Sequence, residues 1–523
     1  MKRDFSLLQG QQFDLLICGG GIYGAWTAYD AALRGLKVAI VEQADWASAT
    51  SSASSKLIHG GLRYLESYDF KLVKKALTER QLLLKIAPHR VWPLRFGVPV
   101  YADSRIHRLQ LKLGLMLYDF LATSLGRNMT HRYFGSLAFA QRFPQLETAN
   151  LKGGFTYSDA QTDDARLVLE LIAGAVAAGA VCVNYCKLDS LRDREDKIYT
   201  ATVQDQLSGV TADIQTKQVV YATGQWSAVA EQSRSWCRVT KGVHLILPEE
   251  FKDEALLLTA KRDGRVFFII PWYGLTLVGT TDTDYKGDIE QVKVESSEID
   301  YLLEAANPYL KTAWTAQDVI HSYAGLRVMK RSDKSAPSSV SRDWELKTTP
   351  NGVHYSIGGK ITSSREDAST IVDQVCAELG MQTSCASKTH LLPWAPVDYA
   401  VWLENTKVEA SKLNIDSESA LWLMRRHGKR VDNVLSEIAL NPALAGRVFP
   451  SVPLIYADLL LCARDEMVVH LEDLLRRRMP LFILNKFCSI DLRKVAYFVA
   501  PTLGWEGDQV EREVAGCAAY CQS

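Results

Sequence analysis

Near the N-terminus, apolar residues fall into two short runs separated by a glycine-rich break and a segment of small residues. The run FDLLIC at 13–18 ends directly before glycines, which predicts a buried parallel strand. Alanines recur from Ile22 to Arg34 and predict a helix that packs closely on a sheet. The run LKVAIV at 36–41 predicts a second strand. Strand, turn, helix and strand over about thirty residues are typical of a dinucleotide-binding fold.

The pattern changes further along the chain. The run QVVYA at 218–222 predicts another strand of the first sheet, whereas VHLILP, RVFFIIPW and LTLVGTTD within 243–285 are typical of antiparallel strands in a second sheet. Past Val397, apolar residues recur at three- and four-residue spacing, which predicts helices. The prolines of LLPWAP mark a domain boundary near residue 392.

We therefore predict an α/β protein. Residues 1–392 form a Rossmann-like dinucleotide-binding domain interleaved with an antiparallel-sheet substrate domain, whose sheet segments lie at roughly 80–150 and 240–345. Residues 393–523 form a C-terminal helical cap domain.

Composition narrows the function classes. Sixty Lys and Arg balance sixty Asp and Glu in 523 residues, so no global positive charge indicates a nucleic-acid partner. The ten cysteines form no C-x-x-C pair, and we expect reduced thiols and no metal site. We read no signal peptide and no run of about 18 apolar residues that would span a membrane.

The glycine-rich break satisfies G-x-G-x-x-G in the context of a strand and a helix, which makes the motif credible. Gly19 permits the tight turn, Gly21 lets the backbone approach a pyrophosphate, and Gly24 lets helix and strand pack closely. Glu42 ends the second strand, where a carboxylate can bind ribose hydroxyls and where Glu, unlike Arg, disfavours a 2′-phosphate. The motif alone does not distinguish NAD from FAD.

The segment 50–64, TSSASSKLIHGGLRY, is dense in hydroxyls, small residues and cations. Such a loop can hydrogen-bond phosphate and pass its backbone close to a flat ring, and a solvated linker would not continue into KLIHGGLRY. The candidate cofactor residues in this segment are Thr50, Ser51, Ser55, Lys56, His59 and Gly60.

This segment closely resembles one found in the FAD-dependent, quinone-linked glycerol-3-phosphate dehydrogenases. The resemblance continues through nearly the whole chain, including ALTERQLLLKIAP at 76–88, YSDAQTDDARLV at 157–168, KGVH at 241–244, GTTD at 279–282 and GGK at 358–360. The C-terminal helices resemble the cap of that family. The resemblance implies an FAD enzyme that transfers a hydride from C2 of sn-glycerol 3-phosphate to flavin N5, forms dihydroxyacetone phosphate and passes electrons to membrane quinone.

The resemblance also assigns roles to residues. Cationic side chains hold the substrate phosphate in that family, and the matching positions are Arg63, Arg342 and Lys360, with Tyr64 beside them. Further cofactor positions are Gly224, Gly359, Lys360 and Thr362. His244 and Arg327 match the candidates for taking the 2-hydroxyl proton. A neutral His is the easier base, whereas Arg better orients the hydroxyl and stabilises alkoxide charge.

Three positions depart from the family, which usually has Ser at Val243, Pro at Val328 and Tyr at Ser364. A lost hydroxyl beside His244 would remove a substrate contact, so another polyol phosphate, such as a tetritol phosphate, is an alternative substrate. An oxygen-using flavin oxidase, an amine oxidase and a non-catalytic flavin protein are further alternatives. The retained cations disfavour the last two.

A membrane quinone requires access to the bilayer. The segment 104–133 combines apolar residues with Arg105, Arg108, Lys112, Arg127 and Arg132, as expected for a helix in the headgroup layer. We therefore expect a cytoplasmic protein attached peripherally to the inner face of the cell membrane. A half-buried helix and a homodimer contact are the alternatives for this segment. The basic run 476–478 is a second cationic candidate or an ordinary solvated charge run.

Overall fold

The computed structural model describes residues 1–66, 68–122, 129–331 and 343–521. Its first sheet has a parallel centre in the order β18, β10, β1, β2, β7. These strands are His354–Gly358, Thr211–Tyr221, Gln12–Cys18, Val38–Val41 and Val181–Val183. β17 (Trp344–Thr348) pairs antiparallel with β18, and β8 (Cys186–Glu195) and β9 (Ile198–Asp205) extend from β10 as a hairpin.

Three helices cover one face of this sheet. α1 (Ile22–Leu33) packs against both α5 (Asp164–Ala177) and α7 (Ser364–Glu378). The alanines of α1 are buried, as expected for a helix held close to the strands. The predicted β1–α1–β2 unit is confirmed, and with it the Rossmann-like α/β fold class.

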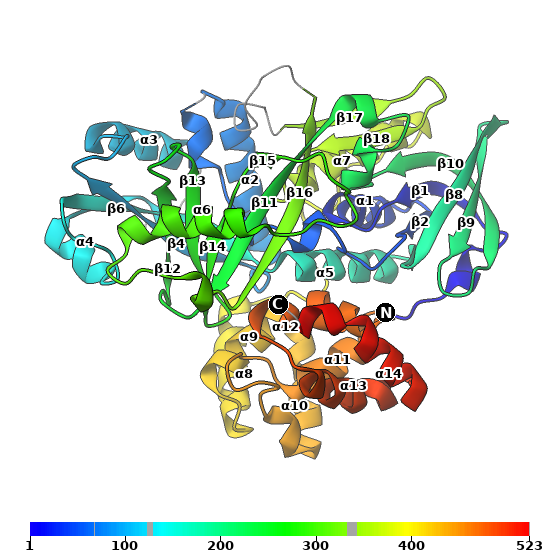
Figure 1. Cartoon of the computed structure of the whole chain (residues 1–523). Coiled ribbons are helices and arrows are strands. Elements are labelled where there is room, and N and C mark those ends of the chain that lie inside the picture. Colours follow the sequence, from blue (N-terminus) through cyan, green and yellow to red (C-terminus); the bar gives the residue numbers. More distant parts are fainter. Residues whose placement is uncertain (67, 123–128, 332–342, 522–523) are drawn as a thin grey trace.

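The second sheet supplies the other half of the N-terminal body (Figure 1). Its pairings are antiparallel except between β4 and β12. The strands are β3 (Leu57–Ile58), β4 (Val91–Tyr101), β5 (Arg132–Gly135), β6 (Leu151–Thr162), β11 (Cys237–Leu247), β12 (Glu254–Thr259), β13 (Val266–Trp272), β14 (Leu275–Gly279), β15 (Thr283–Asp284) and β16 (His321–Lys330). The helices around it are α2 (Phe70–Ile86), α3 (Arg108–Leu121), α4 (Ser136–Arg142) and α6 (Ser296–Ala306).

The C-terminal helices gather below both sheets, with α5 next to them (Figure 1). They are α8 (Tyr399–Lys412), α9 (Ser417–His427), α10 (Val431–Leu440), α11 (Tyr456–Asp465), α12 (Leu481–Leu484), α13 (Ser489–Leu503) and α14 (Gly507–Gly516). Apolar side chains of α8 to α11 form a core of their own, whereas those of α12 to α14 share a core with the second sheet, and both agree with the helical periodicity.

Buried ion pairs attach this helical part to the first sheet. Arg166 of α5 pairs with Glu466, and Arg477 and Arg478 both pair with Asp45 in the turn after β2. All five side chains are buried. The interpretation of 476–478 as a cationic membrane site or a solvated run is therefore wrong for Arg477 and Arg478, because both arginines form ion pairs inside the protein.

Candidate active site

Two adjoining cavities, of about 290 and 170 Å³, form one elongated chamber between the sheets. They share wall residues from the glycine turn, the hydroxyl-rich segment and the end of β10, namely Gly21, Thr50, Ser51, Ala222 and Gly224. Glu42 lies at one end and Lys360 at the other. An elongated chamber of this kind suits a dinucleotide better than a compact ligand.

The glycine turn is shaped by close backbone contacts. A Cβ on Gly19, whose φ is +113°, would lie 2.5 Å from the carbonyl oxygen of Ala222. A Cβ on Gly24 would lie 1.9 Å from the Gly19 carbonyl oxygen, so Gly24 serves packing and does not line the chamber. Gly21 lines both cavities at the N-terminus of α1, where free N–H groups favour a pyrophosphate. The turn therefore fits the phosphates of FAD.

Glu42 supports this turn as well as lining the chamber. Its carboxylate accepts hydrogen bonds from the backbone N–H groups of Gly20, at 2.6 Å, and Ala44, at 2.9 Å. Burial raises the pKa of Glu42, and these two hydrogen bonds oppose that shift. The carboxylate that is predicted to contact the ribose is therefore already held in place by the backbone of the turn.

The hydroxyl-rich segment divides into residues that face the chamber and residues that hold the loop. Ser51 accepts a hydrogen bond from the N–H of Ile22, and Thr50 donates one to the carbonyl oxygen of Leu326. Lys56 instead lies buried against Asp164, at 2.6 Å, and burial lowers its pKa. The N–H of Gly60 donates to Tyr118 and Asp159. The structure thus places Lys56 and Gly60 behind the wall.

The predicted phosphate-binding side chains meet at the far end of the chamber. Arg63, Tyr64 and Lys360 all line it, and the Lys360 Nζ lies 3.7 Å from the centre of the Tyr64 ring. Gly359 and Thr362 line it from the segment before α7, and Thr362 accepts a hydrogen bond from the N–H of His59. Arg342 lies outside the described residues.

Arg327 on β16 also faces the chamber. Its guanidinium donates to the Thr280 hydroxyl, at 2.9 Å, and to the Thr281 carbonyl oxygen, at 3.2 Å. A Cβ on Gly242 would lie 2.3 Å from the Arg327 Nη2, so the glycine of the KGVH motif makes room for this side chain. Arg327 is thereby held rigidly, as a substrate-orienting group requires.

His244 on β11 sits one layer behind the wall. It is 1% exposed and does not line the chamber, and its Nε2 lies 2.8 Å from the Ser55 hydroxyl, which does. Burial, aided by Arg327 and Lys56, lowers the pKa of His244 well below its usual value. The imidazole is therefore neutral at neutral pH. It contacts the chamber only indirectly, through the Ser55 hydroxyl. His59, predicted as a cofactor residue, lines the chamber directly.

Sequence reasoning missed Tyr23 and Asp367. Tyr23 lines the chamber, and its hydroxyl donates to Asp367 at 2.7 Å and accepts from the N–H of Lys360 at 3.0 Å. Burial and the neighbouring Asp367 carboxylate raise the pKa of Tyr23 well above its usual value. A Cβ on Gly359 would lie 1.7 Å from this hydroxyl. The Gly-Gly-Lys motif could have indicated this contact, because its second glycine leaves room for a side chain to pack closely against the backbone.

The three departures from the family have different consequences. Val243 is fully buried in the apolar cluster on the face of β11 opposite His244, so the expected loss of a substrate contact there is wrong. Val328 lines the chamber. The Ser364 hydroxyl donates to the Ile361 carbonyl oxygen and is buried.

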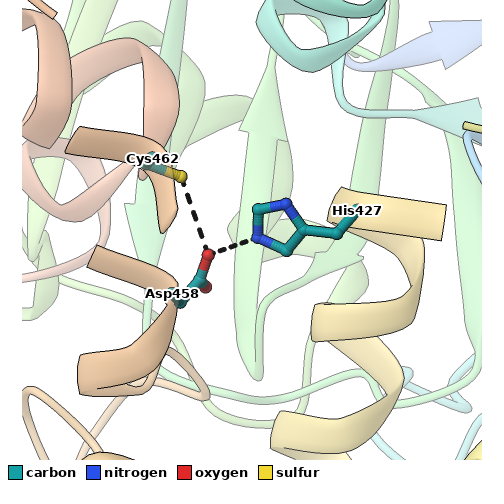
Figure 2. A group of neighbouring side chains, drawn as sticks. All are labelled: His427, Asp458 and Cys462. Carbon is teal, nitrogen blue, oxygen red and sulfur yellow. Dashed lines mark hydrogen bonds and ion pairs between the residues drawn. The ribbon is translucent and has the colours of Figure 1, made fainter. Parts of the chain in front are cut away.

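A group with metal-ligand chemistry occurs in the C-terminal helices, away from the chamber. Figure 2 shows Asp458 between His427 and Cys462. The His427 Nε2 lies 2.5 Å from an Asp458 oxygen. Arg426 donates to both Asp458 oxygens, and Arg166 contacts His427. The buried guanidinium of Arg426 already pairs with the Asp458 carboxylate, and Arg166 reaches His427 from α5, so this cluster is a hydrogen-bonded network that joins the domains.

Comparisons with known proteins agree with this geometry. The family model of FAD dependent oxidoreductases matches residues 14–363, and that of the C-terminal domain of alpha-glycerophosphate oxidase matches residues 393–510. A glycerol-3-phosphate dehydrogenase from Synechocystis is 35% identical over 99% of this chain and 98% of its own. The aerobic enzyme of Escherichia coli is 38% identical over 69% and 73%, respectively.

Two further comparisons bear on substrate and cofactor. A D-erythritol 1-phosphate dehydrogenase from Brucella abortus is 39% identical over 68% of this chain and 71% of its own. The structure of the glycerol-3-phosphate dehydrogenase from Bacillus halodurans, complexed with FAD, has a TM-score of 0.78 at 27% identity, covering 99% of this chain and 96% of that one. The chain described here belongs to the FAD-dependent glycerol-3-phosphate dehydrogenase family.

Proposed function

We propose that this protein oxidises sn-glycerol 3-phosphate to dihydroxyacetone phosphate with FAD as its cofactor and passes the electrons to a membrane quinone. The observation that carries this proposal is the convergence of Arg63, Arg327 and Lys360 on the chamber that fits FAD. Cationic side chains are the groups that recognise a phosphate, and arginine pairs with it through two N–H donors. The relatives named glycerol-3-phosphate dehydrogenase support the same substrate.

In this mechanism, bound FAD supplies a flavin that accepts the C2 hydrogen as a hydride. Arg63 and Lys360 hold the phosphate end of the substrate, and Tyr64 packs beside both cations. Arg327 orients the 2-hydroxyl and stabilises negative charge on its oxygen as the proton leaves. The substrate thus loses one hydride and one proton and becomes a ketone.

We propose that His59 takes the proton and that His244 is a positioning residue that acts through Ser55. A base must reach the hydroxyl within hydrogen-bond distance, and His59 lines the chamber whereas His244 is 1% exposed. The test compares His59→Asn with His244→Asn by anaerobic flavin reduction across pH. We expect His59→Asn to slow reduction by about a hundredfold or more and to abolish its acidic limb, while His244→Asn keeps that limb. The reverse pattern would return the base role to His244.

A tetritol phosphate is the second candidate substrate, favoured by the likeness to a D-erythritol 1-phosphate dehydrogenase. Flavin bleaching by a panel of glycerol 3-phosphate, erythritol phosphate and free glycerol separates the candidates. We expect glycerol 3-phosphate to react fastest and glycerol not at all. A faster four-carbon phosphate would assign the enzyme to the second substrate, and re-oxidation by dioxygen at the rate of quinone would favour an oxidase.

We further propose peripheral attachment to a membrane surface through α3. Four apolar side chains on one side of this helix are exposed, namely Leu109, Leu113, Met116 and Phe120. Arg105, Arg108 and Lys112 lie beside them and are exposed as well, which suits anionic headgroups. Within the described ranges, no helix is both long and apolar enough to cross a bilayer.

A further inference from the structure

A cavity of about 630 Å³ lies between the C-terminal helices and the first part of the hydroxyl-rich segment. One side of its wall comes from Tyr520 and from the π-helix η12 (Asp473–Arg478), a helix type that often occurs at functional sites. The other side comes from the loop 48–53 and from residues 324–326 of β16. Residues of this loop and of β16 also line the chamber. The two spaces therefore adjoin, and we call this one the interdomain cavity.

Arg476 lines the interdomain cavity without a carboxylate partner. Arg477 and Arg478, which follow it in η12, both pair with Asp45. The Arg476 side chain makes no ion pair and no hydrogen bond within the described ranges, and its Nη1 is buried. Its guanidinium carbon lies 5.8 Å from the centre of the Tyr323 ring. The chain thus places three adjacent arginines in η12, and the described residues supply a carboxylate to the last two.

A half-buried guanidinium without a partner is costly, because burial removes water from the charge and nothing replaces it. Burial lowers the pKa of Arg476. Burial, aided by the charge of Arg476, also lowers the pKa of His321 to about 4. Elsewhere in the chain a buried arginine has a carboxylate partner, for example Arg80 with Asp159. An anion from solution would provide the partner that Arg476 lacks.

Two carboxylates also border the interdomain cavity, and both have other partners. Glu472 accepts hydrogen bonds from Arg477 and from the Tyr520 hydroxyl, each at 3.1 Å. Glu290 is exposed, and its carboxylate accepts a hydrogen bond from the Trp226 indole at 3.4 Å. Neither carboxylate therefore serves as the partner of the unpaired guanidinium.

The remaining groups indicate which anion fits the interdomain cavity. Gln43, Ser48 and Gln206 line it with amide and hydroxyl groups, and the exposed Lys187 of β8 adds another cation. The guanidinium of an arginine pairs with phosphate oxygens through two N–H donors. The volume, about 630 Å³, lies within the range of about 300–1,000 Å³ that is typical of small-molecule sites. The cavity thus has room for a phosphate group and for a polar molecule that carries it.

We propose that the interdomain cavity binds a phosphate group, either as inorganic phosphate or on a small metabolite, with Arg476 as its cationic partner. The ligand would contact η12 of the C-terminal part and the loop 48–53 at once. Thr50 of this loop lines the chamber and donates a hydrogen bond to the Leu326 carbonyl oxygen. The ligand would therefore stabilise the segment that holds FAD, and because such coupling is reciprocal, each ligand should strengthen the binding of the other.

The test counts phosphate sites on the oxidised holoenzyme by calorimetry at constant ionic strength. The probes are inorganic phosphate and ribose 5-phosphate, which distinguish a free ion from a phosphate ester. We expect two sites in the wild type, one in the chamber and one in the interdomain cavity. Arg63→Gln should remove the first site, whereas Arg476→Gln should weaken the second by about tenfold or more and leave the first unchanged. Tighter binding of ribose 5-phosphate at the second site would identify an ester as the ligand, and equal binding would identify free phosphate.

Two further variants make the count specific. Arg493→Gln is the matched control, because this arginine of the C-terminal part is about half exposed and already pairs with Glu511, and it should keep both sites. Val292→Trp fills the interdomain cavity from a residue that does not line the chamber, and it serves if Arg476→Gln does not fold. It should remove the second site as well.

The coupling to FAD is measured in the Arg63→Gln background, in which the chamber should no longer bind the probe. Inorganic phosphate should slow the release of FAD severalfold there and have no effect once Arg476→Gln is added. Two sites of unchanged affinity in both Arg476→Gln and Val292→Trp would overturn the inference, as would a single wild-type site that only Arg63→Gln removes. A single site that Arg476→Gln removes would support it even if the chamber binds no phosphate, so its failure is distinguishable from that of the proposed function.

Discussion

Two basic stretches of this chain look alike in the sequence and lie in opposite environments in the structure. Arg105, Arg108 and Lys112 at α3 are exposed beside apolar side chains, whereas Arg477 and Arg478 are buried. The difference lies in their partners, because Asp45 follows β2 more than 400 positions earlier in the chain and accepts hydrogen bonds from both buried arginines. A run of cations in the sequence therefore does not show whether it is exposed or buried, because this depends on carboxylates from distant parts of the chain that the fold places beside it.

The buried stretch should be the more sensitive to loss of charge. Asp45→Asn leaves Arg477 and Arg478 without their shared carboxylate charge, and we expect the free energy of unfolding to fall by about 3–5 kcal/mol. Denaturant unfolding of the holoenzyme measures this change. Glu511→Gln is the control, because its partner Arg493 is about half exposed and such pairs contribute about 0–1 kcal/mol. Equal losses in the two variants would refute the contrast.

The exposed stretch should affect membrane binding and leave stability unchanged. Leu113→Glu with Phe120→Glu removes two apolar side chains, each worth about 1.5–3 kcal/mol of burial in a lipid interface, so vesicle binding should fall by more than about tenfold. Co-sedimentation with anionic vesicles measures it. Leu440→Glu, at an 88% exposed position on α10, is the matched control.

The charges of α3 can be tested in the same assay. A variant with Arg105, Arg108 and Lys112 as Glu should lose the salt-sensitive part of the binding, since salt screens charges but not apolar contacts. Pelleting of wild type and both α3 variants to the same extent would remove α3 from the membrane proposal.

A smaller effect is expected from pH on the stability of the interface between α5 and the C-terminal helices, where His427 is buried. Burial lowers the pKa of His427 to about 3, so the folded protein binds fewer protons than the unfolded chain below the ordinary pKa of about 6.5. The contribution of His427 alone should therefore lower stability by about 1 kcal/mol per pH unit as the pH falls from about 6.5 to about 5. His427→Gln should flatten this slope in thermal unfolding. An unchanged slope would mean that His427 is protonated beside Asp458 in the folded state.

Features of the fold that depend on residues close together in the chain could be predicted from the sequence. The β1–α1–β2 unit and its glycines follow from short spacing, because Gly19, Gly21 and Gly24 act on a turn that they form themselves. The helical C-terminal part follows from periodicity in the same way.

Side-chain direction and distant partners could not be predicted. Lys56 was expected at the cofactor, but it forms a buried ion pair with Asp164, more than 100 positions away, behind the wall of the chamber. His244 and His59 are both in matching motifs, and only the packing of Ser55 and Tyr323 around His244 shows which imidazole faces the chamber. Tyr23 lies within the glycine motif, yet its partner Asp367 comes from α7.

The central claim is that the cations of the chamber bring a polyol phosphate to bound FAD. Anaerobic titration of the purified holoenzyme with sn-glycerol 3-phosphate, followed by flavin absorbance and by assay of dihydroxyacetone phosphate, tests it most directly. We predict stoichiometric bleaching with glycerol 3-phosphate and none with glycerol, and Arg327→Lys should retain FAD while losing most of its rate, since lysine keeps the charge but not the planar fork. Bleaching by glycerol at the same rate, or a purified protein that carries no FAD, would contradict the account.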